Sequence, residues 1–417
     1  MIPLAEAQAR VLSGIEVLPR RRVATVDALG LVLAADVVAN EPIPPFANTA
    51  MDGYAVRAGD TSVASETAPV VLRVVGELPA GRAPTTPVAA REAIRIMTGA
   101  PIPSGADAIV MVEHTERDGD ERVRVMRPAK TGDHVRFAGG DVTEGAVVFS
   151  AGTVVRAAHL GVLASLDVED VEVVPRARVA VLSTGDELVE RGPLAPGQIR
   201  DANRPMLRAL VEEAGAIAVD LGMARDDEAA ITKAIETAAD SCDALVTSGA
   251  VSVGDYDFVK SAIETVAGNR DGSDYMWAQV AIKPAKPLAF GRLGRVRVFG
   301  LPGNPVSSHV SFELFARPAL RMMMGHAEPG RPRVQARAAH DFGRRRDGRL
   351  YVERVVLTRD DDGTFLATRS GVQASNVLSG MARANGLALL PDGDGVREGG
   401  DLTVLVLDLP GVTAHEQ

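Results

Sequence analysis

Small hydroxyl residues, glycines and acids follow a short apolar run in the middle of the chain. The run occupies residues 243–246, and it passes through a loop of small residues into a helix-like segment at 257–266. A strand, a small-residue loop and a helix together offer backbone N–H groups and a helix N-terminus to an anion. Asp255 and Asp257 at the helix start either cap the helix or hold a divalent cation against a phosphate. An ordinary βα turn with a capping aspartate explains the same residues, so this loop alone leaves both interpretations open.

Further acids stand directly after other predicted strands. Glu187 and Asp226 belong to two such loops, and Asp257 belongs to the loop described above. Three carboxylates that face one crevice repel each other unless a cation joins them. Ligands that are all oxygen favour Mg²⁺ over zinc. The seven histidines show no metal-site spacing, and Cys242, the single cysteine, is interpreted as a small buried hydrophobe.

Lysine is rare in this chain, yet two of its five lysines lie within four residues of each other. Lys283 and Lys286 alternate with Pro284 and Pro287, and the prolines keep the backbone extended. Two fixed positive charges suit an oxyanion or a phosphate, although a solvated turn explains them equally well. GxGxxG, Walker A, nucleophile-elbow and HExxH motifs are absent. The acids and lysines therefore indicate phosphoryl-type chemistry or anion transfer without naming a substrate.

Strands and helices that alternate from residue 178 onward position these loops. Strands are predicted at 179–182, 217–221, 243–246, 279–282 and 296–301, and helices at 203–214, 228–239, 257–266 and 306–322. Such alternation predicts a parallel, doubly wound sheet. Ligands of these sheets bind at the carboxyl ends of the strands. Because the acid, serine and Pro-Gly-Asn-Pro loops all fall at those ends, they are predicted to share one site.

The flanking regions have a different pattern. Helical spacing at 3–18 precedes a proline-rich extended linker at 41–46, and Asp52-Gly53 is a turn signal. Residues 57–138 are β-rich, and Thr98 lies in a turn-dense loop between two of their strands. The strands of this insert are predicted at 70–75, 93–97, 108–112 and 123–126, followed by a helix at 157–166. After a linker at 327–332, strands at 350–357, 365–369, 387–390 and 402–407 predict a small barrel or sandwich.

Composition limits the class of protein. The 417 residues are 46% hydrophobic and 24% charged, which is ordinary for a soluble multidomain protein. A net charge of −10 argues against a general nucleic-acid binder. One cysteine fits a reducing compartment. No apolar run reaches the ~18 residues of a membrane span, and the N-terminus lacks the features of a signal peptide. We therefore expect a cytoplasmic protein that binds neither membrane nor nucleic acid.

Taken together, the loops resemble those of one family, the MoeA and gephyrin C-terminal-domain family of molybdopterin molybdenumtransferases. The matching stretches follow the family's order along nearly the whole chain, which makes the resemblance specific. They are residues 44–56, 97–107, 183–188, 198–203, 247–260, 282–290 and 300–307.

The resemblance implies a multidomain fold with a doubly wound, MogA-like α/β domain. The predicted regions are a helical N-terminal region (1–43 and 139–175), an elongated β-rich insert (44–138), the α/β domain (176–326) and a small C-terminal β-barrel (333–410). It also implies a reaction. Adenylylated molybdopterin binds, its AMP linkage is hydrolysed with Mg²⁺, and molybdate is inserted into the dithiolene to give the molybdenum cofactor.

The resemblance also assigns residues. Its catalytic set comprises Asp52, Thr98, Glu187, Asp226 and Asp257, of which the last three bind the metal. Asp52 is expected from the partner subunit of a homodimer. The substrate-binding residues that the resemblance implies are Ser248, Gly249 and Ser252 at the pterin phosphate, Lys283, Lys286 and Pro287 on the molybdate side, and Arg354 and Ser375 from the C-terminal domain.

The chain departs from the family pattern at a few positions, which keeps alternatives open. Ala47 and Thr49 stand where the family commonly has Asp and Ser, and Ala250 and Ala285 stand where it has glycine. An altered paralogue that acts as a molybdopterin-binding scaffold is therefore one alternative, although the retained acids and lysines favour an enzyme. Molybdopterin adenylyltransferase is another, but it resembles residues 174–326 alone.

Overall fold

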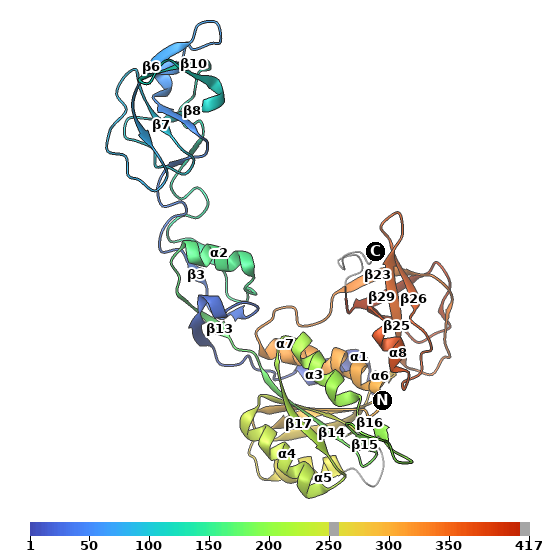
Figure 1. Cartoon of the computed structure of the whole chain (residues 1–417). Coiled ribbons are helices and arrows are strands. Elements are labelled where there is room, and N and C mark those ends of the chain that lie inside the picture. The colour runs from blue at the N-terminus through green and yellow to red at the C-terminus, as the bar shows by residue number, and fades with distance from the viewer. Residues whose placement is uncertain (250–257, 409–417) are drawn as a thin grey trace. The chain divides into compact units, whose positions relative to one another are not determined.

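A computed structural model describes residues 1–249 and 258–408 of the chain (Figure 1). These residues form two compact units. The first contains Met1–Arg21, Gly30–Val32 and Val173–Gln417, and the second contains Arg22–Leu29 and Leu33–Glu172. The four-region boundaries derived from the sequence are finer than this division and stay predictions.

A six-stranded sheet is the centre of the first unit. Its order is β17-β14-β18-β22-β21-β19, with bounds Ile217–Ala224, Arg178–Thr184, Ala244–Ser248, Val296–Leu301, Pro287–Leu293 and Asp274–Gln279. The first four strands are parallel, as predicted. The last two are antiparallel, so the expectation of a wholly parallel sheet was wrong at this edge. Only two residues separate β21 from β22, and a connection that short joins antiparallel strands only.

Helices cover both faces of this sheet, as a doubly wound fold requires. Val179 and Val181 of β14 are buried on one face of the sheet, in a core shared with α3, α6 and α7. Ala180 and Leu182 are buried on the other face, in a core shared with α4 and α5 (Figure 1). The bounds are α1 (Leu4–Leu12), α3 (Asn203–Glu213), α4 (Glu228–Ser241), α5 (Phe258–Gly268), α6 (Pro305–Ser311) and α7 (Arg317–Met323).

Two predicted helices differ from the observed ones. α1 ends at Leu12, before the predicted residue 18, because Gly14 adopts φ +65° and turns the chain. The helix predicted at 306–322 is divided into α6 and α7 by a π-helical turn at Phe312–Ala316. Apolar spacing predicts that such a segment is helical, but it does not reveal the extra residue that a single π-helical turn contains.

The C-terminal domain of the first unit is a closed barrel. Its five strands pair in the order β25-β26-β23-β29-β27, and β25 pairs with β27 to close the ring. This confirms the small barrel predicted from the sequence. A sixth strand, β20 (Ile282–Lys283), leaves the α/β domain and pairs with β25, so the single strand predicted at 279–282 is divided between two sheets. The barrel strands are β23 (Arg333–Ala338), β25 (Leu350–Arg359), β26 (Phe365–Arg369), β27 (Gly386–Leu390) and β29 (Asp401–Val406). Two short elements accompany them, the paired strands β24 (Phe342–Gly343) and β28 (Gly395–Val396) and the helix α8 (Leu378–Ala382).

The second unit contains the β-rich insert. Its six-stranded sheet has the order β8-β5-β7-β6-β10-β9, and four of these strands coincide with the predicted ones. The turn signal at Asp52-Gly53 does not make a hairpin, because β5 pairs with β7 and β8. The strands are β5 (Gly53–Val56), β6 (Val70–Leu78), β7 (Glu92–Ile96), β8 (Ala108–Met111), β9 (Thr115–Arg117) and β10 (Arg122–Val125).

Short strands and one helix lead into and out of the insert. Helix α2 (Ala157–Ser165) confirms the helix predicted at 157–166. The N-terminal segments predicted to be helical contain short strands besides α1 and α2. These are β1 (Arg21–Ala24), β2 (Val32–Leu33), β3 (Val37–Val38), β12 (Val147–Phe149) and β13 (Asp170–Val174), while β4 (Asn48–Thr49) pairs with β11 (Val135–Arg136).

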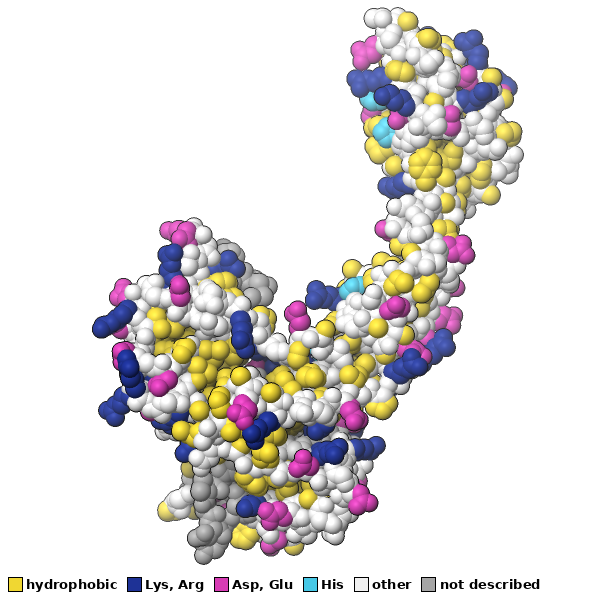
Figure 2. Space-filling view, turned by 180° about the vertical axis from the view of Figure 1, so that it is seen from behind, with side chains coloured by type: hydrophobic (Ala, Val, Ile, Leu, Met, Phe, Trp, Pro, Cys, Tyr) yellow, Lys and Arg dark blue, Asp and Glu magenta, His cyan; other side chains and the backbone are white. Residues whose placement is uncertain are grey.

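The surface carries charges of both signs. On the face shown in Figure 2, basic and acidic side chains of the described residues are interspersed. Within residues 1–249 and 258–408, no helix is both long and apolar enough to cross a membrane.

Candidate active site

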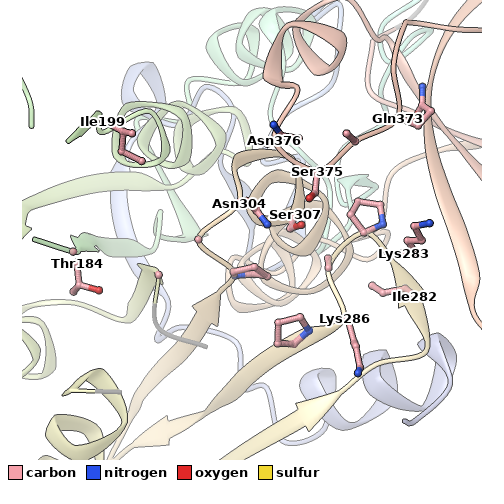
Figure 3. A pocket seen from close by; sticks show the side chains of 18 of the residues that line it. Thr184, Ile199, Ile282, Lys283, Lys286, Asn304, Ser307, Gln373, Ser375 and Asn376 are labelled. Carbon is pink, nitrogen blue, oxygen red and sulfur yellow. The ribbon is translucent and has the colours of Figure 1, made fainter. Parts of the chain in front are cut away.

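A cavity of about 1000 Å³ opens at the carboxyl ends of the parallel strands. The loops after β17, β14, β18 and β22 contribute Asp226, Glu187, Gly249 and Asn304 to its wall. The fold therefore brings these loops together at one cavity, as predicted from the sequence. Figure 3 shows Asn304, Ser307 and Ser375 between Thr184 on one side of the cavity and Lys283 on the other.

Glycines bring the strand-end loops close together. A Cβ at Gly185 would lie 2.6 Å from Glu187 Oε2, so the absence of a side chain lets the carboxylate fold back over the loop. Gly249 adopts φ +93°, and a Cβ there would lie 2.9 Å from the Thr184 carbonyl oxygen. Gly249 therefore requires glycine for close approach to backbone as well as for its own conformation, whereas Gly185, with φ +146°, requires it for conformation alone because the Glu187 carboxylate can move.

Asn203, at the start of α3, ties two of these loops to each other. Its Nδ2 donates to Ser248 Oγ at 2.6 Å and to the Gly303 carbonyl oxygen at 2.7 Å. Ser248, predicted to contact the pterin phosphate, is only 2% exposed and directs its hydroxyl into this bond. The described structure therefore gives Ser248 a role in loop geometry, while Gly249 lines the cavity.

Residues 282–287 line the cavity and lead into β21, which lies three strands away from β14, the strand that precedes Glu187. Lys283, Lys286 and Pro287, all predicted from the sequence, are among these cavity residues. In Figure 3 the two lysines lie on the same side with their ammonium groups pointing in different directions. Ala285 between them is buried and adopts φ +74°, a conformation that favours glycine. This explains in physical terms why the family pattern has glycine at that position.

Of the two residues predicted from the C-terminal domain, Ser375 lines the cavity and Arg354 does not. Ser375 lines the cavity, and its carbonyl oxygen accepts from the Val306 N–H at 3.1 Å. Arg354 is fully buried, does not line the cavity, and donates from Nη2 to the Val372 carbonyl oxygen at 2.7 Å. Burial lowers its pKa. Arg354 N–H also donates to the Gln373 side chain at 2.8 Å, so Arg354 holds the loop that presents Gln373 to the cavity.

Asp52 and Thr98 form a pair within the second unit. One oxygen of Asp52, Oδ1, accepts from both the backbone N–H and the hydroxyl of Thr98, each at 2.7 Å. These bonds, the backbone one first, lower the pKa of Asp52, with the positive charge of Arg95 adding to the effect. Two of the five residues that the resemblance assigns to catalysis are thus adjacent, and Asp52 is ionised at neutral pH.

Four residues singled out from the sequence fall outside the described part of the chain. They are Asp257 of the metal set, Asp255 beside it, Ser252 of the phosphate set and Ala250. Among the described residues, no group of three His, Cys, Asp or Glu side chains is placed to hold a metal ion. Glu187 and Asp226 line the same cavity, so the two described members of the predicted metal set share one site, and their oxygens are of the type that Mg²⁺ prefers.

Comparisons with known proteins agree over the whole chain. Models of the MoeA N-terminal region (domains I and II), a probable molybdopterin-binding domain and the MoeA C-terminal region (domain IV) match residues 2–166, 180–322 and 335–407. Molybdopterin molybdenumtransferase 2 of Mycobacterium tuberculosis is 43% identical over 88% of this chain and 89% of its own length. Molybdopterin molybdenumtransferase of Bacillus subtilis is 34% identical over 97% and 94%.

The chain belongs to the MoeA family. The molybdopterin biosynthesis MoeA protein from Pyrococcus horikoshii OT3 has the same fold, with a TM-score of 0.81 and 31% identity over 97% of this chain and 100% of that one. These matches include the insert and the C-terminal barrel, which the adenylyltransferase alternative lacks.

Several cavity residues of this MoeA-family protein were not singled out from its sequence. Asn304 lies in the Pro-Gly-Asn-Pro loop and Ser307 in the first turn of α6, so the position of that loop after β22 is the signal that could have found them. Thr184 is the last residue of β14, and its position at a strand end is the same kind of signal. Arg349 and Gln373 carry no such signal, because they reach the cavity only through the docking of the barrel on the α/β domain.

Proposed function

We propose that this MoeA-family protein is a molybdopterin molybdenumtransferase. It binds adenylylated molybdopterin, hydrolyses the AMP linkage and inserts molybdate to give the molybdenum cofactor. The observation that carries the proposal is one cavity with Glu187 and Asp226 on one side and Lys283 and Lys286 on the other. The names of relatives that match nearly the full chain support the same activity.

The chemistry divides between the two sides of the cavity. Backbone N–H groups of the Pro-Gly-Asn-Pro loop bind the phosphate of the pterin, because N–H groups at strand ends and helix starts favour anions. Lys283 and Lys286 attract molybdate and orient it for transfer to the dithiolene sulfurs.

Mg²⁺ fits the acidic side. Glu187 and Asp226, with Asp257 from outside the described residues, would hold it through oxygen atoms. Bound there, the ion neutralises charge that develops on the phosphoryl oxygens during hydrolysis. Without a cation, two ionised carboxylates next to a phosphate would weaken substrate binding by repulsion.

We test this function by AMP release from adenylylated molybdopterin with Mg²⁺, in the presence and absence of molybdate. Molybdate-dependent release is expected for the wild type. Glu187→Gln should lower the rate by about a hundredfold, since it removes one metal ligand. Glu236→Gln, on the exposed side of α4, is the matched control and should release AMP at the wild-type rate. A wild type that binds the pterin but releases no AMP indicates a scaffold and contradicts the proposal.

Lys286→Ala separates the anion side from the acidic side. It should raise the molybdate concentration for half-maximal release by about tenfold, because one charge near the anion contributes on the order of 1.4 kcal/mol. Lys233→Ala in α4 is the control. An unchanged molybdate dependence in Lys286→Ala rules out this role for the lysine.

The proposal includes a cytoplasmic homodimer in which Asp52 acts in the partner's cavity. Asp52→Asn and Glu187→Gln should each be inactive alone. When the two are co-expressed, half of the dimers mix the variants and each mixed dimer has one intact site, so about a quarter of the wild-type activity should return. Return of no activity would place Asp52 and Glu187 of one protomer in the same site instead.

A further inference from the structure

Arg349, directly before the barrel strand β25, brings a third cationic side chain to the cavity. Its Nε donates to Asp347 Oδ2 at 3.0 Å, Nη2 donates to the same oxygen, and its backbone N–H donates to Oδ1 at 3.2 Å. The side chain is 27% exposed. A guanidinium has five N–H donors in a fixed plane. Two of these five donors, the N–H of Nε and one N–H of Nη2, fix the orientation, which leaves both N–H groups of Nη1 and the second of Nη2 to meet two oxygens of a ligand.

Asp347 is the shared anchor of this side of the cavity. Besides Arg349, it accepts from the Tyr351 hydroxyl at 2.9 Å and from Arg344 Nη2 at 3.3 Å. The bond from Arg349, followed by that from Tyr351, lowers the pKa of Asp347 to about 2, so its charge is permanent at neutral pH. A fixed negative charge holds two neighbouring arginines without the repulsion they would otherwise feel.

Tyr351 extends the anchor to Lys283. Pairing of β20 with β25 places the two residues side by side in register. Lys283 Nζ lies 3.4 Å from the Tyr351 hydroxyl oxygen and 4.6 Å from the ring centroid. Arg344, whose side chain is fully buried, lies with its guanidinium carbon 4.2 Å from the same centroid. The Tyr351 ring therefore contacts two cations, the buried Arg344 and Lys283, of which Lys283 lines the cavity.

We propose that Arg349 is a further anion-binding residue of the cavity and that Asp347 and Tyr351 are the positioning residues that orient Arg349 and Lys283 toward a tetrahedral oxyanion. This inference rests on the proposed function, for which the oxyanion is molybdate. A planar guanidinium binds two oxygens of such an ion at once, whereas an ammonium acts as a point charge. The barrel thus sets the affinity for the anion, and the strand-end loops of the α/β domain bind the pterin.

The test compares Arg349→Gln and Tyr351→Phe with Arg346→Gln. Arg346 lies in the same segment but is 70% exposed and pairs with Asp394, which makes it the matched control. Tyr351→Phe keeps the ring and removes only the hydroxyl. The readouts are AMP release as a function of molybdate concentration and equilibrium dialysis of radioactive molybdate, which needs no turnover.

Arg349→Gln should raise the half-saturating molybdate concentration by about tenfold and Tyr351→Phe by about threefold. The rate at saturating molybdate and the affinity for adenylylated molybdopterin should stay within about twofold of wild type, because neither residue contacts the pterin. Arg346→Gln should match the wild type in every measurement. A loss of saturating rate with an unchanged half-saturating concentration would overturn the proposal, since it would indicate a general structural role.

The dialysis distinguishes failure of this inference from failure of the proposed function. If the wild type releases AMP but Arg349→Gln keeps the wild-type molybdate dependence, the inference is wrong and the function stands. If the wild type releases no AMP, the function fails, and dialysis decides about the anion site. Molybdate retained by the wild type and lost in Arg349→Gln supports the site. Equal retention, or no retention by the wild type, overturns it.

Discussion

Ala285 is held in a backbone conformation that a non-glycine residue rarely adopts. Its φ of +74° brings Cβ toward the following carbonyl oxygen, at a cost of roughly 1–2 kcal/mol. The residue lies between the two cavity lysines, so its strain is located where the anion binds. Alanine in place of the family's glycine at this position therefore lowers the stability of the folded protein and adds no chemical group to the site.

Ala285→Gly should stabilise the protein by about 0.5–1 kcal/mol. Relief of the left-handed strain exceeds the entropy that glycine gains in the unfolded chain. Urea unfolding monitored by circular dichroism measures the change. Ala238→Gly, at a buried position in the last turn of α4, should instead destabilise by about 1 kcal/mol. A glycine at 285 that lowers stability as much as one at 238 would show that φ +74° is not strained in this context.

Thr98→Val tests the pair formed by Asp52 and Thr98. It removes the hydroxyl that donates to Asp52 Oδ1 and leaves the backbone N–H in place. Because hydrogen bonds to the ionised form lower a pKa, the pKa of Asp52 should rise toward its ordinary value without reaching it. Carbon-detected NMR titration of the Asp52 carboxyl measures this directly. Thr115→Val, whose hydroxyl donates to the Val112 carbonyl oxygen, should leave the titration unchanged.

Elements whose apolar pattern is local could be predicted from the sequence. β14 and β18 are continuous buried runs, and Glu187 after β14 and Asp226 after β17 line one cavity because parallel strands present their carboxyl ends at one edge. The antiparallel edge of the sheet was missed, since the direction of β21 depends on the length of a turn and not on apolar periodicity. Arg349 and Gln373 were missed because their place depends on the pairing of β20 with β25, two segments far apart in the chain.

Asn203→Ala should loosen the loops that β18 and β22 present to the cavity. The substitution leaves the Ser248 hydroxyl and the Gly303 carbonyl without their shared donor, at an expected cost of about 1–3 kcal/mol. Hydrogen exchange should accelerate at the Gly249 N–H, which donates to the Leu301 carbonyl oxygen within the same loops. Asn269→Ala, exposed at the end of α5, is the control. Unchanged exchange at Gly249 would mean that the backbone alone fixes these loops.

The α/β domain and the barrel are joined by buried charges as well as by strand pairing. Arg331 lies in the segment predicted to be a linker, yet it donates twice to the carboxylate of Glu313 at 2.8 Å and once to the Leu407 carbonyl oxygen at 3.0 Å. Glu313 is 1% exposed, so removal of Arg331 would leave a buried charge without this partner. Sequence composition identifies a proline-rich connection but does not reveal that one of its residues is anchored in both domains.

Arg331→Met should therefore destabilise the first unit by about 3–5 kcal/mol, the cost typical of breaking a buried ion pair from one side. Replacement of both partners, Arg331→Met with Glu313→Leu, should recover only part of that loss, because it removes the buried Glu313 charge but takes from the buried Arg317 its partner at 3.8 Å. Thermal unfolding of the three variants measures the coupling. Additive losses in the double variant would show that each residue contributes independently through packing.

Acid sensitivity of the same region follows from His326, next to this cluster. Burial, with the nearby charges of Arg321 and Arg317, lowers its pKa to about 4 from an ordinary value near 6.5. The unfolded chain therefore binds a proton at a higher pH than the folded one, and the stability that the neutral ring contributes is complete above about pH 6.5 and lost as the pH falls toward 4. His326→Gln should reduce the dependence of the melting temperature on pH over this window. Part of that dependence should remain, because burial also lowers the pKa of His309. His114→Gln in the second unit is the control. If His326→Gln keeps the full wild-type slope between pH 6.5 and 4, the acid sensitivity arises elsewhere, and the ring is not held neutral by its surroundings.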